Sequence, residues 1–185
     1  MNKEFKPGCL AAKEKLKLIN ISNYSRTRNY LNGQVTRLSP YITHGLLDLT
    51  EIYNSIALID LNLNEKFIKE LAWREYFYHV WDHKKDKIFS SLKEGALAEH
   101  YYSKHLPLDI LQGQTGLKPI DKSIEILYRN GYLHNHARLW LASYLIHYRK
   151  IHWRVGADWM YSHLLDGDLA SNHLSWQWVA GTNSH

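Results

Sequence analysis

The hydrophobic and polar positions along this chain repeat with the period of an α-helix. Apolar side chains recur at spacings of three and four residues, which places them on one face of a helix. The segments with this pattern are residues 46–59, 66–81 and 134–150. The apolar stripe of the last segment consists of Leu141, Tyr144, Leu145 and Tyr148. The pattern predicts three amphipathic helices.

Two further helices are indicated by their ends. Pro119 stands where a helix needs no backbone N–H and Gly131 where a left-handed cap is common, so a helix is predicted over 119–131. A short helix is expected over 158–165, just before the turn that contains Asp166. No segment alternates polar and apolar residues as a strand does. The sequence therefore predicts an all-α fold, a helical bundle.

Two segments lack this periodicity. Residues 20–40 are polar and basic, and in residues 84–118 glycine, proline and charged positions interrupt any helical pattern. A long connection in a compact domain is commonly functional. At 185 residues the chain has the size of one domain, so we expect a single domain over 1–185 that begins with a basic segment over 1–23.

The composition narrows the class of protein. Cys9 is the single cysteine, which excludes an internal disulfide framework and a cysteine-based zinc site and fits the reducing cytoplasm. No run approaches the roughly eighteen apolar residues of a membrane span, and the N-terminus has no hydrophobic signal region. We therefore expect a cytoplasmic protein with no membrane partner.

The positive charge is concentrated at the start of the chain. The net charge is +5; residues 1–50 hold eight Lys and Arg against three Asp and Glu, while the rest of the chain holds fifteen of each kind. This distribution favours a polyanionic partner, either the phosphate of a cofactor or nucleic acid. A solvated basic helix face is the alternative interpretation.

Twelve histidines raise the question of a metal site. The pairs His134 with His136 and His147 with His152 lack the four-residue spacing that points two imidazoles at one ion, and no HExxH motif occurs. No metal site is predicted. The sequence also contains neither a GxSxG nucleophile elbow nor a glycine-rich phosphate-binding motif.

Polar residues embedded among aromatic ones form the candidate chemistry. The loop with Thr36, Arg37 and Ser39 leads into a helix and suits an anionic group, although such a stretch also occurs as an ordinary helix-leading loop. Glu70, Trp73 and Arg74 share one helix face. This face is either a salt-bridged surface or the wall of a ligand pocket. The residues alone leave both alternatives open.

A second polar group lies towards the C-terminal end. Arg138 stands in an otherwise apolar helix and therefore needs a carboxylate, which Asp166 or Asp168 can provide. The pair is either a structural ion pair or part of a ligand site. The sequence does not decide between the two.

Several blocks together resemble the C-terminal FAD-binding domain of the photolyase/cryptochrome family. The matching blocks are residues 24–29 with 35–45, 66–77, 115–146 and 158–182. They occur in the order found in the family and cover most of the chain. The resemblance implies a helical bundle that holds FAD in a folded shape.

The resemblance also implies roles for individual residues. Tyr24 and residues 35–39 would hold the phosphates, Arg138 would pair with a carboxylate, preferably Asp166, and Asn172 would face flavin N5. The implied FAD-binding residues are Tyr24, Val35, Thr36, Arg37, Leu38, Ser39, Phe67, Trp73, Arg74, Asn135, Arg138, Asp166, Asp168 and Asn172.

The tryptophans receive separate roles from the same resemblance. Trp176 would donate an electron to the flavin and Trp153 would be the next donor in a relay to the surface. Trp178 and Trp73 would line the cavity that receives a flipped-out pyrimidine dimer, and Glu70 and Asn135 would hydrogen-bond the lesion. The implied catalytic residues are Glu70, Asn135, Trp178 and the N5-facing Asn172. Arg28 and the basic N-terminal half would contact the DNA backbone.

The chain departs from the family pattern at several places. The third relay tryptophan is missing from residues 95–105, so Tyr101 or Tyr102 would replace it or the relay is shorter. Few residues precede the matching part, so no light-harvesting antenna is expected, and the chain stops at His185, soon after the last block. We therefore expect either a fragment or a minimal domain that a partner protein completes.

The resemblance implies a deoxyribodipyrimidine photo-lyase. Reduced FAD would pass an electron, driven by blue light, to a cyclobutane pyrimidine dimer in DNA. The first alternative is a non-catalytic blue-light photoreceptor or redox flavoprotein, and the second is a degenerate fragment without activity.

Overall fold

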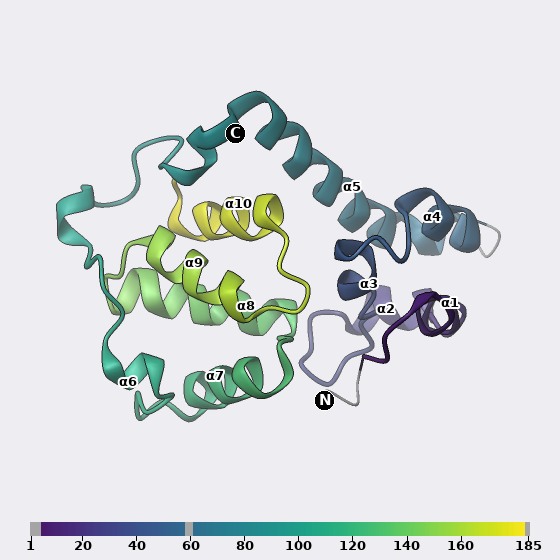
Figure 1. Cartoon of the computed structure of the whole chain (residues 1–185), viewed down its shortest axis with the longest axis horizontal. Helices are drawn as coiled ribbons and strands as arrows, with labels where there is room; N and C mark the ends of the chain where they lie inside the picture. Colours follow the sequence, from purple (N-terminus) through teal and green to yellow (C-terminus); the bar gives the residue numbers. More distant parts are fainter. Residues whose placement is uncertain (1–4, 58–60, 184–185) are drawn as a thin grey trace. The chain divides into compact units, whose positions relative to one another are not determined.

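The computed structural model describes residues 5–57 and 61–183, and every helix in them is shown in Figure 1. The α-helices are α1 (Cys9–Lys17), α2 (Ile21–Thr27), α3 (Ser39–Thr43), α4 (Leu49–Ala57), α5 (Leu61–Lys84), α6 (Leu108–Leu111), α7 (Lys118–Asn130), α8 (Asn135–Ser143), α9 (Trp153–His163) and α10 (Leu169–Ala180). Two 3₁₀ helices, η1 (Lys85–Phe89) and η2 (Glu99–Tyr101), and one π-helix, η3 (Tyr144–Tyr148), complete the set. The described residues contain no β-strand, which confirms the all-α prediction.

The chain divides into two compact units, Met1–Tyr76 and Phe77–His185, with the boundary inside α5. No helix in the described part is long and apolar enough to cross a membrane. The expectation of a single domain over the whole chain stays a prediction.

The first unit is built on short helices. Helix α1 packs against α4. The buried side chains include Ala12, Ile21, Leu38, Ile52, Ile56 and Phe67. Helix α2 lies within residues 20–40, where the sequence predicted a loop, and it begins at a cap in which the Asn20 side chain accepts a hydrogen bond from the Asn23 N–H at 3.1 Å. A cap of this kind stabilises a helix too short to show an apolar period.

The second unit has one hydrophobic core, formed by α7 to α10 and η3. Helix α10 contacts both α8 and α9, and α7 packs against α8 (Figure 1). Fully buried side chains of this core include Ile124, Leu127, Leu141, Leu145, Ile146 and Met160. The stripe predicted over 134–150 supplies Leu141 and Leu145, while Tyr148 is exposed.

The predicted helix ends differ in accuracy. Helix α7 ends at Gly131, whose φ of 61° is the predicted left-handed cap. The helix predicted over 134–150 instead changes from α8 to the π-helical η3 after Ser143. The helix expected over 158–165 begins earlier, at Trp153, because the His152 side chain accepts a hydrogen bond from the Arg154 N–H.

Helix α4 lies within the predicted range 46–59, of which positions 58 and 59 fall outside the described residues. Helix α5 extends beyond the predicted 66–81 at both ends. The long connection over 84–118 contains η1, η2 and α6. It is tethered by Arg149, which donates to both carboxylate oxygens of Asp109 at 2.7 and 3.1 Å. These hydrogen bonds lower the pKa of Asp109.

Helices α9 and α10 approach each other closely at Gly156. A Cβ atom placed there would lie 2.4 Å from Cζ3 of Trp176. We expect Gly156→Ala to lower the free energy of unfolding, because about 1–3 kcal/mol of overpacking exceeds the roughly 1 kcal/mol that alanine gains in a helix. Urea denaturation measures the change. In a Trp176→Phe background the smaller ring should relieve part of the loss, and an unchanged stability of the single variant would contradict the close packing.

Candidate functional site

A cavity of about 480 Å³ lies in the first unit at the loop after α2. Its lining residues are Lys15, Leu18, Ile19, Asn20, Tyr24, Gly33, Gln34, Val35, Thr36 and Arg37. Four residues predicted to hold phosphates therefore share one concave surface with a lysine. Leu38 is instead buried in the core, and Ser39 begins α3.

The backbone of this loop has two constraints. Arg37 has a positive φ of 54° and is followed by Leu38 in the right-handed region, a sequence of conformations that turns successive N–H groups towards one side. A Cβ atom at Gly33 would lie 1.8 Å from the carbonyl oxygen of Thr27, so only glycine fits that approach. The Gln34 N–H donates to Thr27 Oγ1 at 3.0 Å, which holds the loop against the end of α2.

Helix α5 contributes aromatic and basic side chains to the same unit. Phe67 is buried and meets Tyr24 edge to face, with ring centroids 5.2 Å apart. Arg74 donates a hydrogen bond to Thr43 Oγ1 at 3.5 Å. Trp73 is 54% exposed. Phe67 and Tyr24 thus support each other, whereas Trp73 presents its indole to solvent.

Arg28 and Glu70 form an ion pair. Burial by itself lowers the pKa of Arg28, but the attraction of Glu70 and the hydrogen bonds with Tyr24 and Glu70 outweigh it and raise the pKa. The family resemblance implied that Arg28 contacts the DNA backbone and that Glu70 contacts the lesion, with no contact expected between them. In the structure the guanidinium of Arg28 fixes the position of the Glu70 carboxylate.

The second unit contains the buried ion pair that the sequence favoured. Arg138 Nη2 donates to the two carboxylate oxygens of Asp166 at 2.9 and 2.8 Å. Arg138 Nε donates to the Leu133 carbonyl oxygen at 2.7 Å, and the guanidinium lies 5.3 Å from the centre of the Tyr132 ring. Asp166 is buried. The arginine is therefore held in one orientation from several sides.

Asp168 and Asn172 are also engaged with the protein. Asp168 caps α10 by accepting from the Ser171 N–H at 2.8 Å and receives a second hydrogen bond from the Tyr78 hydroxyl. Asn172 Nδ2 donates to the Ala157 carbonyl oxygen at 2.9 Å. An amide has two N–H groups and an oxygen, so Asn172 keeps further hydrogen-bonding capacity. Asn135 begins α8 and is exposed.

The tryptophans of the second unit fall into two groups by exposure. Trp153 and Trp176 are each 3% exposed and belong to the same hydrophobic core. Trp178, two residues after Trp176 on α10, is 58% exposed. The two residues predicted to carry electrons are thus buried, and the one predicted to meet the lesion is open to solvent.

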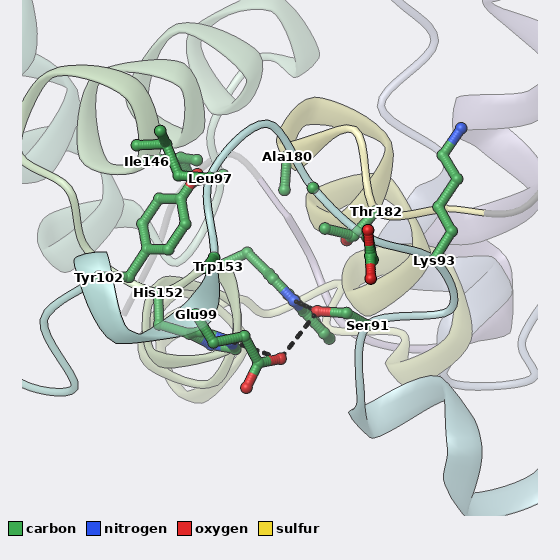
Figure 2. A pocket seen from close by; sticks show the side chains of 13 residues that line it. Ser91, Lys93, Leu97, Glu99, Tyr102, Ile146, His152, Trp153, Ala180 and Thr182 are labelled. Carbon is green, nitrogen blue, oxygen red and sulfur yellow. Dashed lines mark hydrogen bonds and ion pairs between the residues drawn. The ribbon is translucent and has the colours of Figure 1, made fainter.

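A second cavity, of about 610 Å³, lies beside Trp153 (Figure 2). It is lined by Ser91, Lys93, Glu94, Gly95, Leu97, Ala98, Glu99, Tyr102, Ile146, His152, Trp153, Ala180 and Thr182. Tyr102 lines it and lies edge to face with His152, with centroids 6.3 Å apart. Tyr101 is exposed and contacts His100 instead. Of the two tyrosines considered for the relay, Tyr102 is the one near Trp153.

Some residues of these sites were not recognised in the sequence. Tyr78 and Ser91 bond to residues far along the chain, so no local pattern indicates them. His79 and His83 do have the four-residue spacing of a metal pair, and their ring centroids lie 4.3 Å apart. Over residues 5–57 and 61–183, however, no group of three or more histidine, cysteine, aspartate or glutamate side chains is arranged to hold a metal ion.

A family model described as the FAD binding domain of DNA photolyase matches residues 67–185. The chain belongs to this photolyase family. The matched range contains the Arg138–Asp166 pair and the tryptophans of α9 and α10. The implied fold and family are therefore confirmed.

Sequence and structure comparisons with individual proteins give the same family. The chain is 30% identical to a deoxyribodipyrimidine photo-lyase of Streptomyces griseus over 89% of its own length and 36% of the relative. A cryptochrome structure from Synechocystis has a TM-score of 0.88 and 27% identity, covering 98% of this chain and 40% of that one. An archaeal photolyase from Sulfolobus tokodaii with two FAD molecules has a TM-score of 0.80 and 25% identity, covering 98% and 41%. The chain thus spans about two fifths of the length of these relatives.

Proposed function

We propose that this chain binds FAD and uses blue light to transfer an electron from the reduced flavin to a cyclobutane pyrimidine dimer in DNA. The observation that carries the proposal is the membership of the FAD-binding family together with the cavity in the first unit, which is lined by the predicted phosphate-binding residues. Bound FAD would supply the light absorption and the transferable electron.

The first cavity fits the phosphate part of a dinucleotide. Lys15 and Arg37 provide positive charge at its wall, and Arg37 has a positive φ, as residues of anion-binding backbone turns often do. Convergent N–H groups and cations are what a pyrophosphate requires. Tyr24 and Thr36 add hydroxyl groups at the same surface.

The polar residues of the second unit suit the flavin ring. The Arg138–Asp166 pair is a fixed dipole in a buried position, and Asn172 offers an amide for N5. Ser171 has a buried hydroxyl for which the described residues provide no hydrogen-bond partner. A buried polar atom of this kind indicates a ligand or water that completes it.

Buried and exposed tryptophans suit different tasks. Trp176 and Trp153 are shielded from water and packed in one core, which favours electron transfer between indole rings. Trp178 and Trp73 present exposed indoles on which an extruded base can stack. Glu70, oriented by Arg28, and Asn135 are the proposed hydrogen-bonding partners of the lesion.

The repair proposal predicts a selective loss in Trp178→Ala. Removing an aromatic stacking surface costs about 1–3 kcal/mol per base, so repair of a dimer-containing oligonucleotide should fall about 5- to 150-fold. Flavin content should not change, because Trp178 is exposed. The matched control is Trp140→Ala, which removes another exposed tryptophan of the same unit. Equal repair by both variants would contradict the role of Trp178.

A blue-light receptor is the second candidate function. The buried pair Trp153 and Trp176 and the similarity to the Synechocystis cryptochrome favour it. The two functions differ in one measurement. A photolyase removes dimers from DNA in the light and not in the dark, whereas a receptor is photoreduced and leaves the dimers intact.

A further inference from the structure

The indole N–H of Trp153 points to a serine hydroxyl. Trp153 Nε1 donates to Ser91 Oγ at 3.0 Å, while the side chain itself is 3% exposed (Figure 2). A buried indole N–H normally has one such partner. The proton of Trp153 therefore has Ser91, and not bulk water, as its neighbour.

The serine connects this proton to the surface. Ser91 Oγ donates to Glu99 Oε1 at 3.3 Å, and the Glu99 side chain is 66% exposed. The same carboxylate oxygen lies 3.7 Å from His152 Nε2. Trp153, Ser91 and Glu99 all line the cavity of about 610 Å³ beside Trp153. The three groups form a continuous hydrogen-bonded chain from the core to solvent.

We propose that Ser91 and Glu99 carry away the indole proton when Trp153 is oxidised; this inference rests on the proposed function. Bound FAD would supply the light-driven electron acceptor, and Trp153 would lose one electron to it through Trp176. The Nε1 proton passes to Ser91 Oγ as the hydroxyl proton of Ser91 passes to Glu99. Trp153 is left as a neutral radical, Ser91 is unchanged, and Glu99 is a neutral acid that releases its proton to water. The electron would remain on the bound FAD.

The step has a physical reason. Loss of an electron makes an indole N–H strongly acidic, so an acceptor within hydrogen-bond reach removes the proton quickly. Once the proton has left, the electron cannot return without it, and the separated charges persist. The device therefore lengthens the life of the light-induced state.

Other groups around Trp153 do not provide this route. His173 lies edge to face with Trp153 at 6.5 Å between centroids, and its ring nitrogens contact the Leu169 carbonyl oxygen at 3.0 Å and Asp158 at 2.9 Å. His152 is adjacent in sequence, and its Nδ1 accepts from the Arg154 N–H. The indole N–H itself is directed at Ser91.

The test is a blue-light flash on the full chain with FAD bound, followed by the absorption bands that distinguish a tryptophan radical cation from a neutral radical. In Ser91→Ala and in Glu99→Gln the conversion of cation to neutral radical should slow about a hundredfold, the scale of a lost proton acceptor. Ser91→Thr keeps the hydroxyl and should convert at the parent rate. Parent rates in both Ser91→Ala and Glu99→Gln would overturn the proposal.

Glu94→Gln is the matched control. Glu94 lines the same cavity, so this variant removes the same charge without interrupting the hydrogen-bonded chain. It should convert at the parent rate. If Glu94→Gln slows the conversion as much as Glu99→Gln, the effect is one of general charge and the proton route is wrong.

A flavin-free readout separates this inference from the proposed function. An ultraviolet laser flash ejects an electron from indole directly. The difference in radical absorption between the parent protein and Trp153→Phe is the contribution of Trp153. A slow Trp153 signal in flavin-free Ser91→Ala supports the proton route even if the chain takes up no FAD. If the Trp153 radical cation converts at the parent rate in flavin-free Ser91→Ala, the proton route is wrong, even if flavin binding and repair are normal.

Discussion

Replacing Asp166 with asparagine is expected to lower the free energy of unfolding by about 3–5 kcal/mol, the range for breaking a buried ion pair at one partner. The carboxylate is buried and accepts two hydrogen bonds from Arg138. Asparagine has nearly the same volume but leaves the guanidinium without its counter-charge. Arg138 cannot easily turn to water, because its Nε remains bonded to the Leu133 carbonyl oxygen. Urea denaturation followed by circular dichroism measures the loss.

The control for this experiment is an exposed carboxylate. Glu125 pairs with Lys122 and Arg129 on the surface of α7, where water and salt screen the charges, so Glu125→Gln should cost far less stability than Asp166→Asn. The proposed flavin site adds a second expectation, since Asp166→Asn should also lower the amount of FAD retained. Equal stabilities of the Asp166 and Glu125 variants would contradict the buried pair.

Replacing Trp176 with phenylalanine is expected to slow blue-light photoreduction of bound flavin by about tenfold or more, equivalent to at least roughly 1.4 kcal/mol of barrier. A phenyl ring is much harder to oxidise than indole, so the first electron donor is removed. The ring position is buried against Gly156, and phenylalanine fits there without clash because it is smaller. FAD content and the circular dichroism spectrum should remain those of the parent. The rate is followed by the bleaching of the flavin band under steady illumination.

Trp159→Phe is the matched control for the donor. Trp159 is buried in the same core, but its Nε1 donates to the Tyr128 hydroxyl on α7. Flavin bound to the Trp159→Phe variant should be photoreduced at the parent rate. An unchanged rate in the Trp176 variant, or an equal loss in both, would remove Trp176 from the relay.

The sequence predicted those parts of the fold that local chemistry determines. Pro119 and Gly131 mark the two ends of α7. Proline is tolerated in the first turn of a helix, where no backbone N–H is needed, and glycine easily adopts the left-handed conformation that ends the helix. Helix α10 was not predicted, since its buried residues, among them His173 and Gln177, lie around the helix and leave no single apolar stripe. The change from α8 to the π-helix at Tyr144 likewise depends on tertiary packing.

The candidate site shows the same division. Arg138 stands out as a charge in an apolar helix, so its need for a carboxylate was visible, and Asp166 is the partner. The bond from Tyr78 to Asp168 joins residues 90 apart and the bond from Trp153 to Ser91 joins residues 62 apart. No spacing rule relates such positions. The roles taken from the family resemblance stay predictions that the variants above test.

Whether this chain is a flavin protein is decided by the absorption spectrum of the purified protein after desalting. We expect flavin bands that stay with the protein fraction and that are lost from it when the protein is denatured and filtered. If the protein folds with its full helical circular dichroism, is reconstituted with FAD and emerges colourless from desalting, the claim is contradicted.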